Sequence, residues 1–251
     1  MDLQSSGSIE YAGFCSSCQQ EHTLAADGAY QAAIQLMAVL KLRGRIDFDQ
    51  AESNPLFSTE YLFGPARGKM FGVMTARAPD GRMMTVRAFS GQYNGIWQVA
   101  GWVKPVFELR AFHQIHDEEE KIIKAMGQQI NELPDGSVQR KKCILLRKQR
   151  SQRLMKNIHA LYQLRNFQGQ VNGFEEIFPT GMGIPSGTGD CCAPKLLQYA
   201  ANHALIPQGL AEFYWGRENA SGTRQHGCFY PSCREKCQPI LGFMLCGLAQ
   251  S

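Results

Sequence analysis

The sequence predicts an α+β protein in which a β-hairpin and a small sheet carry packed helices, with a long helical hairpin inserted into the chain. Two β-rich runs within residues 69–89 flank a Pro-Asp-Gly turn, which is a hairpin signal. A helical apolar period occupies residues 108–167 and is interrupted once. A helix over 193–204 and a strand over 208–215 follow. We therefore expect an α+β body that the helical insertion interrupts.

The bulk composition is that of a globular protein rather than a disordered or membrane-spanning one. The 251 residues are 44% hydrophobic and 19% charged, and no run approaches the roughly 20 apolar residues that span a bilayer. The first residues lack the basic and apolar regions of a signal peptide, so the nine cysteines favour reduced thiols in the cytoplasm. A net charge of +4 is compatible with a nucleic-acid partner but does not require one. We expect a cytoplasmic protein without a membrane partner.

This pattern divides the chain into three parts. Residues 1–107 form an N-terminal part, with a helix over 29–44 that a glycine ends, then the hairpin, then a loop rich in tryptophan and glycine. Residues 108–167 form the inserted helical hairpin. Residues 168–251 form a cysteine-containing part that completes the α+β body and includes a last helix beginning at the PSCREKC segment.

The two arms of the inserted hairpin carry opposite charge. A Pro-Asp-Gly break separates an acidic first arm from a basic second arm, and no Asp or Glu lies between Gly136 and Phe174. A basic helix of this kind favours RNA phosphates through a salt-dependent, sequence-independent contribution, or else it only pairs with the acidic arm. The side chains that we expect to contact RNA are Lys141, Lys142, Arg147, Lys148, Arg150 and Arg153. The aromatic side chains that are either base-stacking platforms or core anchors are Trp97, Trp102, Tyr214 and Trp215.

Four cysteines in the last part have the spacing of a metal site. Zinc takes four tetrahedral ligands, and short Cys-to-Cys steps supply two of them at a time. One pair lies one helical turn apart, and the other is adjacent at a predicted helix start, where thiolates are favoured. We expect zinc on Cys233 and Cys237, with Cys191 or Cys192 as the third ligand and water, Cys228 or His226 as the fourth, unless these thiols are core residues.

The order of helix start, strand and second cysteine pair resembles that of zinc nucleobase deaminases. These enzymes carry a glutamate two residues after the first ligand, where this chain has Ala193 or Pro194. Their second motif also has two intervening residues, where this chain has three. The resemblance implies a cytidine-deaminase-like core that is compatible with zinc. Glu212, on the intervening strand, is a weak candidate for the general base.

A second half-site lies near the N-terminus. Cys15 and Cys18 form a C-x-x-C pair, and His22 follows four residues later. These side chains would form a small zinc knuckle if a ligand came from elsewhere, whereas a redox pair would need a thioredoxin-like βαβ context that is missing here. We expect Cys143 and Cys246 to be ordinary buried thiols.

A family resemblance runs through most of the chain. The blocks that carry it are, in order, KMFGVM, RAFSGQYNGIW, GWVKPVF, GTGDCCAPKLLQYA, LAEFYWG and FYPSCREKCQPILGFMLCGL. They resemble the N-terminal extension that precedes the catalytic domain in long-form RluA-type pseudouridine synthases. The resemblance implies two partners, an RNA such as rRNA or tRNA and the synthase catalytic domain.

The catalytic motif of that family is not found in this chain. Its aspartate lies in a His-Arg-Leu-Asp or Gly-Arg-Leu-Asp setting, and the nearest string here is Gly-Arg-Ile-Asp, ending at Asp47 after a predicted helix. We therefore expect an accessory, RNA-binding region that is not catalytic in this chain. The alternatives are a zinc-dependent, deaminase-like hydrolase acting on a nucleobase or nucleoside, and a structural docking domain for the synthase.

Overall fold

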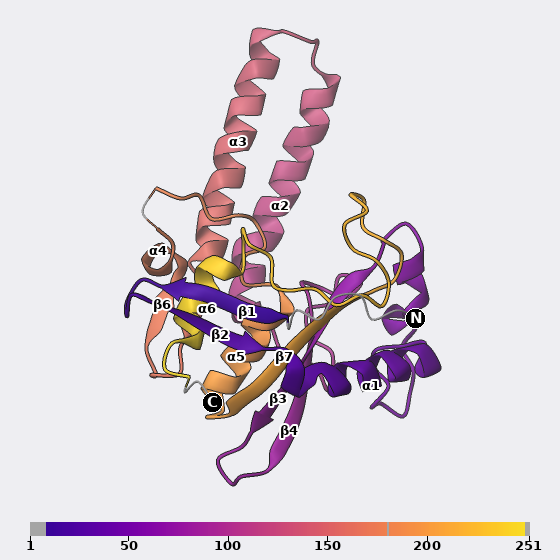
Figure 1. Ribbon diagram of the computed structural model, residues 1–251. Coiled ribbons are helices and arrows are strands. Elements are labelled where there is room, and N and C mark those ends of the chain that lie inside the picture. The colour runs from indigo at the N-terminus through magenta and orange to yellow at the C-terminus, as the bar shows by residue number, and fades with distance from the viewer. Residues whose placement is uncertain (1–8, 180, 249–251) are drawn as a thin grey trace. The chain divides into compact units, whose positions relative to one another are not determined.

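A computed structural model describes residues 9–179 and 181–248 of the chain. They form two compact units: a body made of the residues up to 106 and those from 164 onward, and a second unit of residues 107–163. The predicted α+β class is confirmed, because small antiparallel sheets and helices build the body and a pair of long helices forms the second unit (Figure 1).

A three-stranded antiparallel sheet with the order β4-β3-β7 lies at the centre of the body. β3 (Lys69–Arg77) and β4 (Met83–Phe89) form the hairpin predicted around the Pro-Asp-Gly turn. β7 (Ile206–Trp215) pairs with the other edge of β3, and this register places Glu212 opposite Gly72. The sheet therefore joins segments that lie on either side of the insertion in the sequence.

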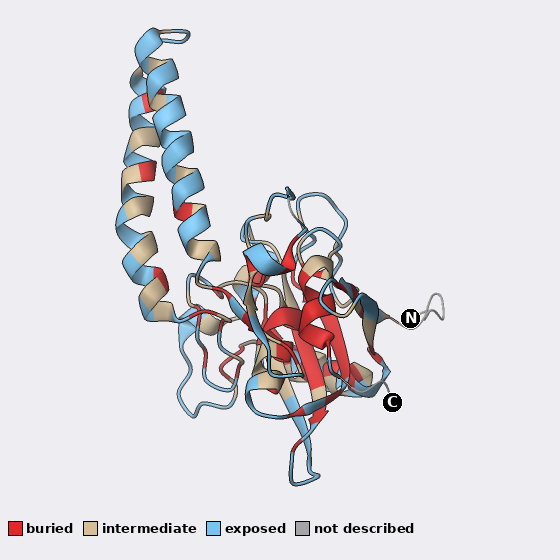
Figure 2. Ribbon diagram, turned by 90° about the vertical axis from the view of Figure 1, so that its left-hand side faces the viewer, coloured by how far each residue is buried: buried red, intermediate tan, exposed pale blue. Residues whose placement is uncertain are grey.

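The two faces of this sheet meet different neighbours. Phe71 and Phe213 pair in register and stack with ring centroids 5.8 Å apart, so they build an aromatic core on one face. On the opposite face Gly72 lies against the start of α5 (Cys192–Asn202), and a Cβ at this position would collide with Cys192. The missing side chain thus lets α5 approach the sheet closely. Figure 2 shows the sheet and the helices against it as the buried part of the body.

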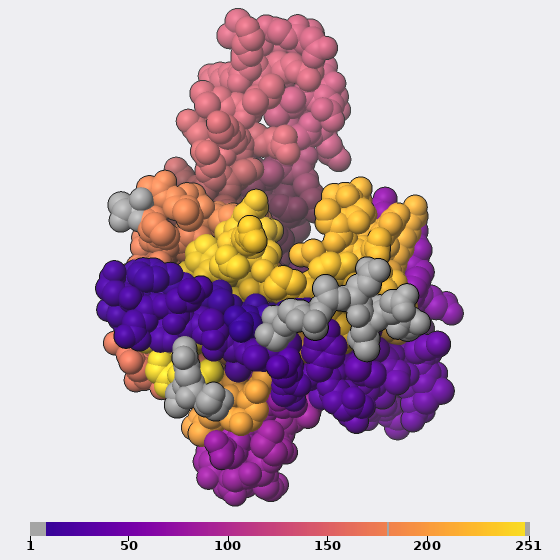
Figure 3. All heavy atoms as spheres, viewed as in Figure 1, coloured from indigo at the N-terminus to yellow at the C-terminus, as the bar shows by residue number. Residues whose placement is uncertain are grey.

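Shorter elements complete the body. α1 (Asp27–Arg43) ends at Gly44, as predicted, and packs against β3 and β7. A first hairpin, β1 (Glu10–Cys15) and β2 (Gln20–Ala25), is not predicted by the sequence and packs against α6 (Gln238–Leu245). Figure 3 shows this contact as indigo atoms of the hairpin beside yellow atoms of the last helix. The remaining elements are the 3-10 turns Pro55–Phe57 and Glu60–Phe63, the paired strands β5 (Gln163–Arg165) and β6 (Val171–Gly173), and α4 (Phe174–Ile177).

The second unit consists of two antiparallel helices, α2 (Leu109–Glu132) and α3 (Val138–His159), which pack along each other (Figure 1). Ser137 caps α3, because its Oγ accepts a hydrogen bond from the backbone N–H of Arg140 at 3.1 Å. Few of the side chains are buried, so most of each helix faces solvent (Figure 2).

Within residues 9–179 and 181–248, no helix is both long enough and apolar enough to cross a membrane.

Candidate metal centres and basic helix

The fold of the body brings cysteine thiols together in two clusters. In each group the candidate ligand atoms all lie within 4.8 Å of one another. Such distances allow one ion to reach every member of a group after small side-chain adjustments. The histidine cluster consists of Cys15, Cys18, His22 and Cys246, and the three-cysteine cluster consists of Cys191, Cys233 and Cys237.

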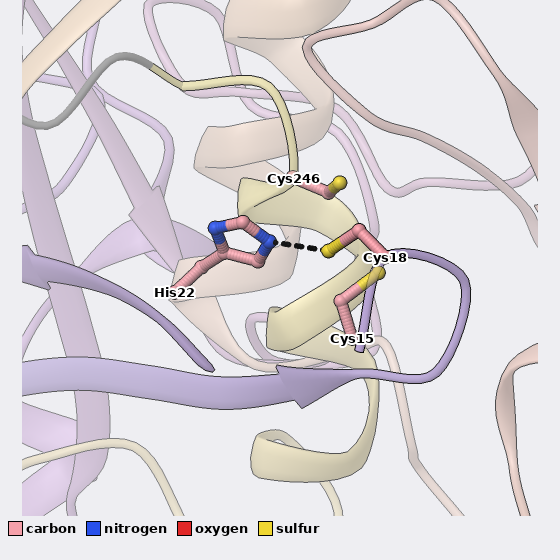
Figure 4. A group of neighbouring side chains, drawn as sticks. All are labelled: Cys15, Cys18, His22 and Cys246. Atoms are coloured by element: carbon pink, nitrogen blue, oxygen red, sulfur yellow. Dashed lines mark hydrogen bonds between the residues drawn. The ribbon is translucent and has the colours of Figure 1, made fainter. Parts of the chain in front are cut away.

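The first hairpin supplies three donors of the histidine cluster (Figure 4). Cys15 ends β1, Cys18 lies in the turn, and His22 comes from β2, with its Nε2 3.0 Å from the Sγ of Cys18. The turn is tight, because the N–H of Gln19 donates to the carbonyl of Cys15 at 2.9 Å and Gln19 has a φ of 59°. The local fold therefore gathers the three donors that the sequence predicted.

Cys246 supplies the fourth donor from the other end of the chain. It directly follows α6, and its carbonyl accepts a hydrogen bond from the N–H of Phe167 at 3.0 Å. The residue is buried, as predicted, but it is not an ordinary core thiol because its Sγ belongs to the histidine cluster. No local sequence pattern links Cys246 to the first hairpin.

Hydrogen bonds within the histidine cluster favour a thiolate. Burial alone would raise the pKa of Cys15, but the N–H groups of Cys18 and Ser17 and the neighbouring thiols lower this pKa overall. Burial and the neighbouring thiols raise the pKa of Cys246 to about 12. Because zinc binds the thiolate form of cysteine, amides directed at sulfur assist metal binding.

The three-cysteine cluster lies where two helices begin. Cys191 is the N-cap of α5, and Cys233 and Cys237 occupy the turn immediately before α6. In this turn the N–H of Cys237 donates to the carbonyl of Cys233 at 3.2 Å, and the two Sγ atoms lie 3.4 Å apart. The prediction that the last helix begins at the PSCREKC segment is wrong, because the helix begins at Gln238, after this turn. One cysteine pair and one helix cap thus offer three donors.

Cys192 belongs to neither cluster, so its prediction as a ligand is wrong. Its Sγ lies 3.4 Å from the carbonyl oxygen of Met70 on β3, and its side chain is fully buried. Cys191 is the extended N-cap and Cys192 is the first helical residue, so their side chains meet different neighbours.

Glu212 is a buried carboxyl group next to the start of α5. Its Oε1 accepts a hydrogen bond from the N–H of Ala193 at 2.7 Å, and its own N–H donates to the Oη of Tyr11 at 2.7 Å. Burial raises the pKa of Glu212 to about 7, although the N–H of Ala193 opposes the rise, and Cys233 raises it further. A carboxyl group in this range can both accept and donate a proton near neutral pH.

Some basic side chains of α3 contact α2, and others have no ion pair among the described residues. Arg150 forms a two-pronged ion pair with Glu119 of α2, with both N–O distances at 3.0 Å. Arg147 lies over Gly127 of α2. The exposed basic side chains of α3 for which the described residues contain no ion-pair partner within 4.0 Å include Lys141, Lys142, Arg147, Lys148 and Arg153.

Several acids of α2 are paired within α2 itself. Glu118 pairs with Lys121 at 3.5 Å, and Glu120 pairs with Lys124 at 3.0 Å. The alternative that the basic arm only neutralises the acidic arm therefore holds for Arg150 but leaves lysines of α3 available.

The other sequence candidates have structural roles. Asp47, which is 2% exposed, pairs with Arg45 at 2.9 Å and accepts a hydrogen bond from the N–H of Asn54, so it holds a loop in place. The base-stacking interpretation of the aromatic candidates is wrong, because all of them are buried with 9% exposure or less: Trp97, Trp102, Tyr214 and Trp215.

Comparison of the chain with known proteins gives no match to a protein-family model, a curated protein or a solved structure. The resemblance to the extension of RluA-type synthases therefore remains an expectation that rests on the sequence blocks alone.

Proposed function

We propose that this chain is an accessory RNA-binding region of an RluA-type pseudouridine synthase and that α3 contacts the RNA. The observation that carries the proposal is that Lys141, Lys142 and Lys148 are exposed on a helix that lacks acidic residues and have no ion pair among the described residues. Lys141 and Lys148 are seven residues apart, which is about two helical turns or about 10 Å along one side of α3. Charges at this spacing can contact separate, non-adjacent phosphates along one RNA strand.

The chemistry of this surface favours phosphate contacts over base contacts. Lysine is a compact point charge that recognises phosphate without reading the base. The buried tryptophans offer no stacking platform at the surface. We therefore expect α3 to hold structured RNA with little sequence preference, and we expect the synthase domain to provide the chemistry.

A salt titration of RNA binding tests this role of α3. The triple variant Lys141→Gln, Lys142→Gln, Lys148→Gln removes three phosphate contacts, so its plot of log affinity against log salt should be shallower by about 2 to 3. Filter binding of rRNA and tRNA fragments from about 50 mM to about 200 mM salt measures the slope.

A charge-matched variant is the control. The exposed residues Lys41, Arg43 and Arg77 lie in the body, and their replacement by Gln lowers the net charge by the same three units. This variant should keep the wild-type slope. An equal loss of affinity in both triple variants would contradict a contact specific to α3. Absence of RNA binding at low salt would reject the proposal and leave the structural docking role.

A second candidate function is zinc-dependent hydrolysis at the three-cysteine cluster. Three thiols leave the fourth position of a tetrahedral ion open to water, as in catalytic zinc sites. The carboxyl group of Glu212 reaches the N–H of Ala193, the position at which the deaminase pattern places its own glutamate. A cavity of about 380 Å³ has Arg234 and Gln238 in its wall, but Glu212 does not line it. For this reason hydrolysis ranks below RNA binding.

Ammonia release from cytidine, adenosine and RNA tests the hydrolase. Zinc-loaded protein should deaminate one of these substrates, and Glu212→Gln should abolish turnover while zinc content stays unchanged, because glutamine still accepts the N–H of Ala193. Cys143→Ser is the control and should retain the activity. Zinc-loaded protein that releases no ammonia from any member of the panel would reject this candidate.

A further inference from the structure

We propose that the histidine cluster is a closed zinc site in which Cys246 is the fourth ligand, so that the ion ties the first hairpin to the end of α6. This inference does not depend on RNA binding or on hydrolysis at the three-cysteine cluster.

The donor set specifies the metal. Three sulfur atoms and one imidazole nitrogen form a ligand combination found in structural zinc sites, and a borderline-soft ion such as zinc suits both atom types. Four protein ligands complete a tetrahedron and leave no position for water. The site is therefore closed, in contrast to the three-cysteine cluster.

The distances fit such an ion. Tetrahedral bonds of about 2.3 Å to sulfur and about 2.0 Å to nitrogen place two sulfurs about 3.8 Å apart and a sulfur and a nitrogen about 3.5 Å apart. Every donor pair in the cluster lies within 4.8 Å, and the nitrogen of His22 lies 3.0 Å from the sulfur of Cys18. Rotations of side chains that shift the donors by about 1 Å reach the required geometry.

The imidazole distinguishes a metal site from a disulfide. A disulfide would use two of the three thiols and would leave His22 without a role. The Nε2 of His22 lies 3.0 Å from the Sγ of Cys18, and the donor atoms of Cys15 and Cys246 lie within 4.8 Å of both, so the imidazole is placed to share one ion with all three thiols. Both observations favour a metal-bound state.

The backbone holds the fourth ligand in position from two directions. Cys246 is fixed on one side by the hydrogen bond from Phe167 to its carbonyl group. On the other side, Gly13 of β1 and Gly242 of α6 approach so closely that a Cβ on either would overlap the backbone of the other element. The end of α6 is therefore positioned against the hairpin by packing that does not require the metal.

Binding of the ion exchanges protons for metal bonds. Zn²⁺ replaces the protons of the three thiols, which pass to solvent, while the imidazole binds as its neutral form. Three thiolates and one Zn²⁺ leave a net charge of −1 within the site. No oxidant or reductant takes part in this exchange. Because four protein ligands leave no open position for water or substrate, the ion serves folding rather than catalysis.

Measuring the zinc content of the purified full chain tests the site. Two substitutions are compared, one that removes the fourth ligand and one that replaces it with another zinc ligand. Cys246→Ser should lose about one equivalent of zinc relative to wild type, whereas Cys246→His should retain it because imidazole is also a zinc ligand. A core position would show the reverse preference, since serine is close to cysteine in size and histidine is much larger. Cys143→Ser is the control and should keep the wild-type zinc content.

Cobalt substitution gives a second measurement that does not depend on the Ser variant being folded. The Cys246→His protein loaded with Co²⁺ should keep a tetrahedral spectrum, with a sulfur-to-cobalt band weaker by about one third than that of the wild-type site. To isolate this site, both spectra are recorded in a Cys191→Ser, Cys233→Ser background. Equal zinc in wild type and Cys246→Ser, or an unchanged sulfur band in Cys246→His, would overturn the assignment.

Discussion

Lys195 shows how a single buried charge responds to its surroundings. It is 1% exposed, and its Nζ donates to the carbonyl groups of Phe89 and Gly91, both at 2.9 Å. Burial lowers the pKa of Lys195 to about 8, although the nearby carboxylate of Asp190 opposes the shift. The folded protein therefore binds this proton less tightly than the unfolded chain does.

This difference predicts how stability depends on pH. Between about pH 8 and about pH 10.5 the unfolded chain keeps the proton of Lys195 that the folded protein has lost, so stability gains from this residue as pH rises. The free energy of unfolding of wild type minus that of Lys195→Met should increase by about 3 kcal/mol at most over this range. Urea denaturation at several pH values measures it, and a constant difference would contradict the low pKa.

Only some of the metal ligands could be predicted from the sequence. The spacing of Cys15, Cys18 and His22 is local, so three donors of the histidine cluster could be predicted from it. Cys246 could not be predicted, because its place depends on how α6 packs against β1. The spacing could not decide between Cys191 and Cys192 as a ligand, because adjacent residues at a helix start face different neighbours.

At the scale of elements, the close approach of β1 and α6 organises the histidine cluster. Gly13 and Gly242 leave no room for a side chain where the strand and the helix meet. A methyl group at either position must push the two elements apart, and Cys246 lies one turn after Gly242.

Gly242→Ala should therefore weaken both the fold and the metal site. Overpacking of this kind costs about 1 to 3 kcal/mol, and the displaced helix end should reduce zinc affinity at the histidine cluster at least tenfold. Gly183→Ala is the control, because no atom lies within 4 Å of its added Cβ. Denaturant unfolding and competition with a zinc chelator measure the two effects. A Gly242→Ala protein with wild-type zinc affinity would show that the contact does not position Cys246.

Elements with strong local signals could be predicted, and those without them could not. The Pro-Asp-Gly turn of β3 and β4 and the glycine that ends α1 are such signals. The turn between β1 and β2 contains neither glycine nor proline, and Gln19 adopts its left-handed conformation instead. For this reason the first hairpin was missed.

At the scale of the whole molecule, the second unit is a candidate for removal as a module. The ends of its helical pair meet within the unit, where the rings of Phe107 and Tyr162 lie 5.1 Å apart. A short Gly/Ser linker can therefore replace residues 109–160 without stretching the chain.

The shortened protein should separate zinc binding from RNA binding. It should retain the zinc content of wild type, because both clusters lie in the body, and it should lose most of the salt-dependent RNA affinity. Metal analysis and filter binding on the same preparation measure both properties. RNA binding with the wild-type salt slope in the shortened protein would show that α3 is not the contact.

Cys15 and Cys246 are 231 positions apart in the sequence. This separation gives the zinc ligands unequal roles during folding. An unfolded chain can offer its first three donors to an ion locally, but closing a loop of this length costs about 5 kcal/mol of chain entropy. The fourth zinc bond therefore forms only once the body has brought its two ends together. Zinc held by all four ligands is therefore a reporter of completed tertiary structure.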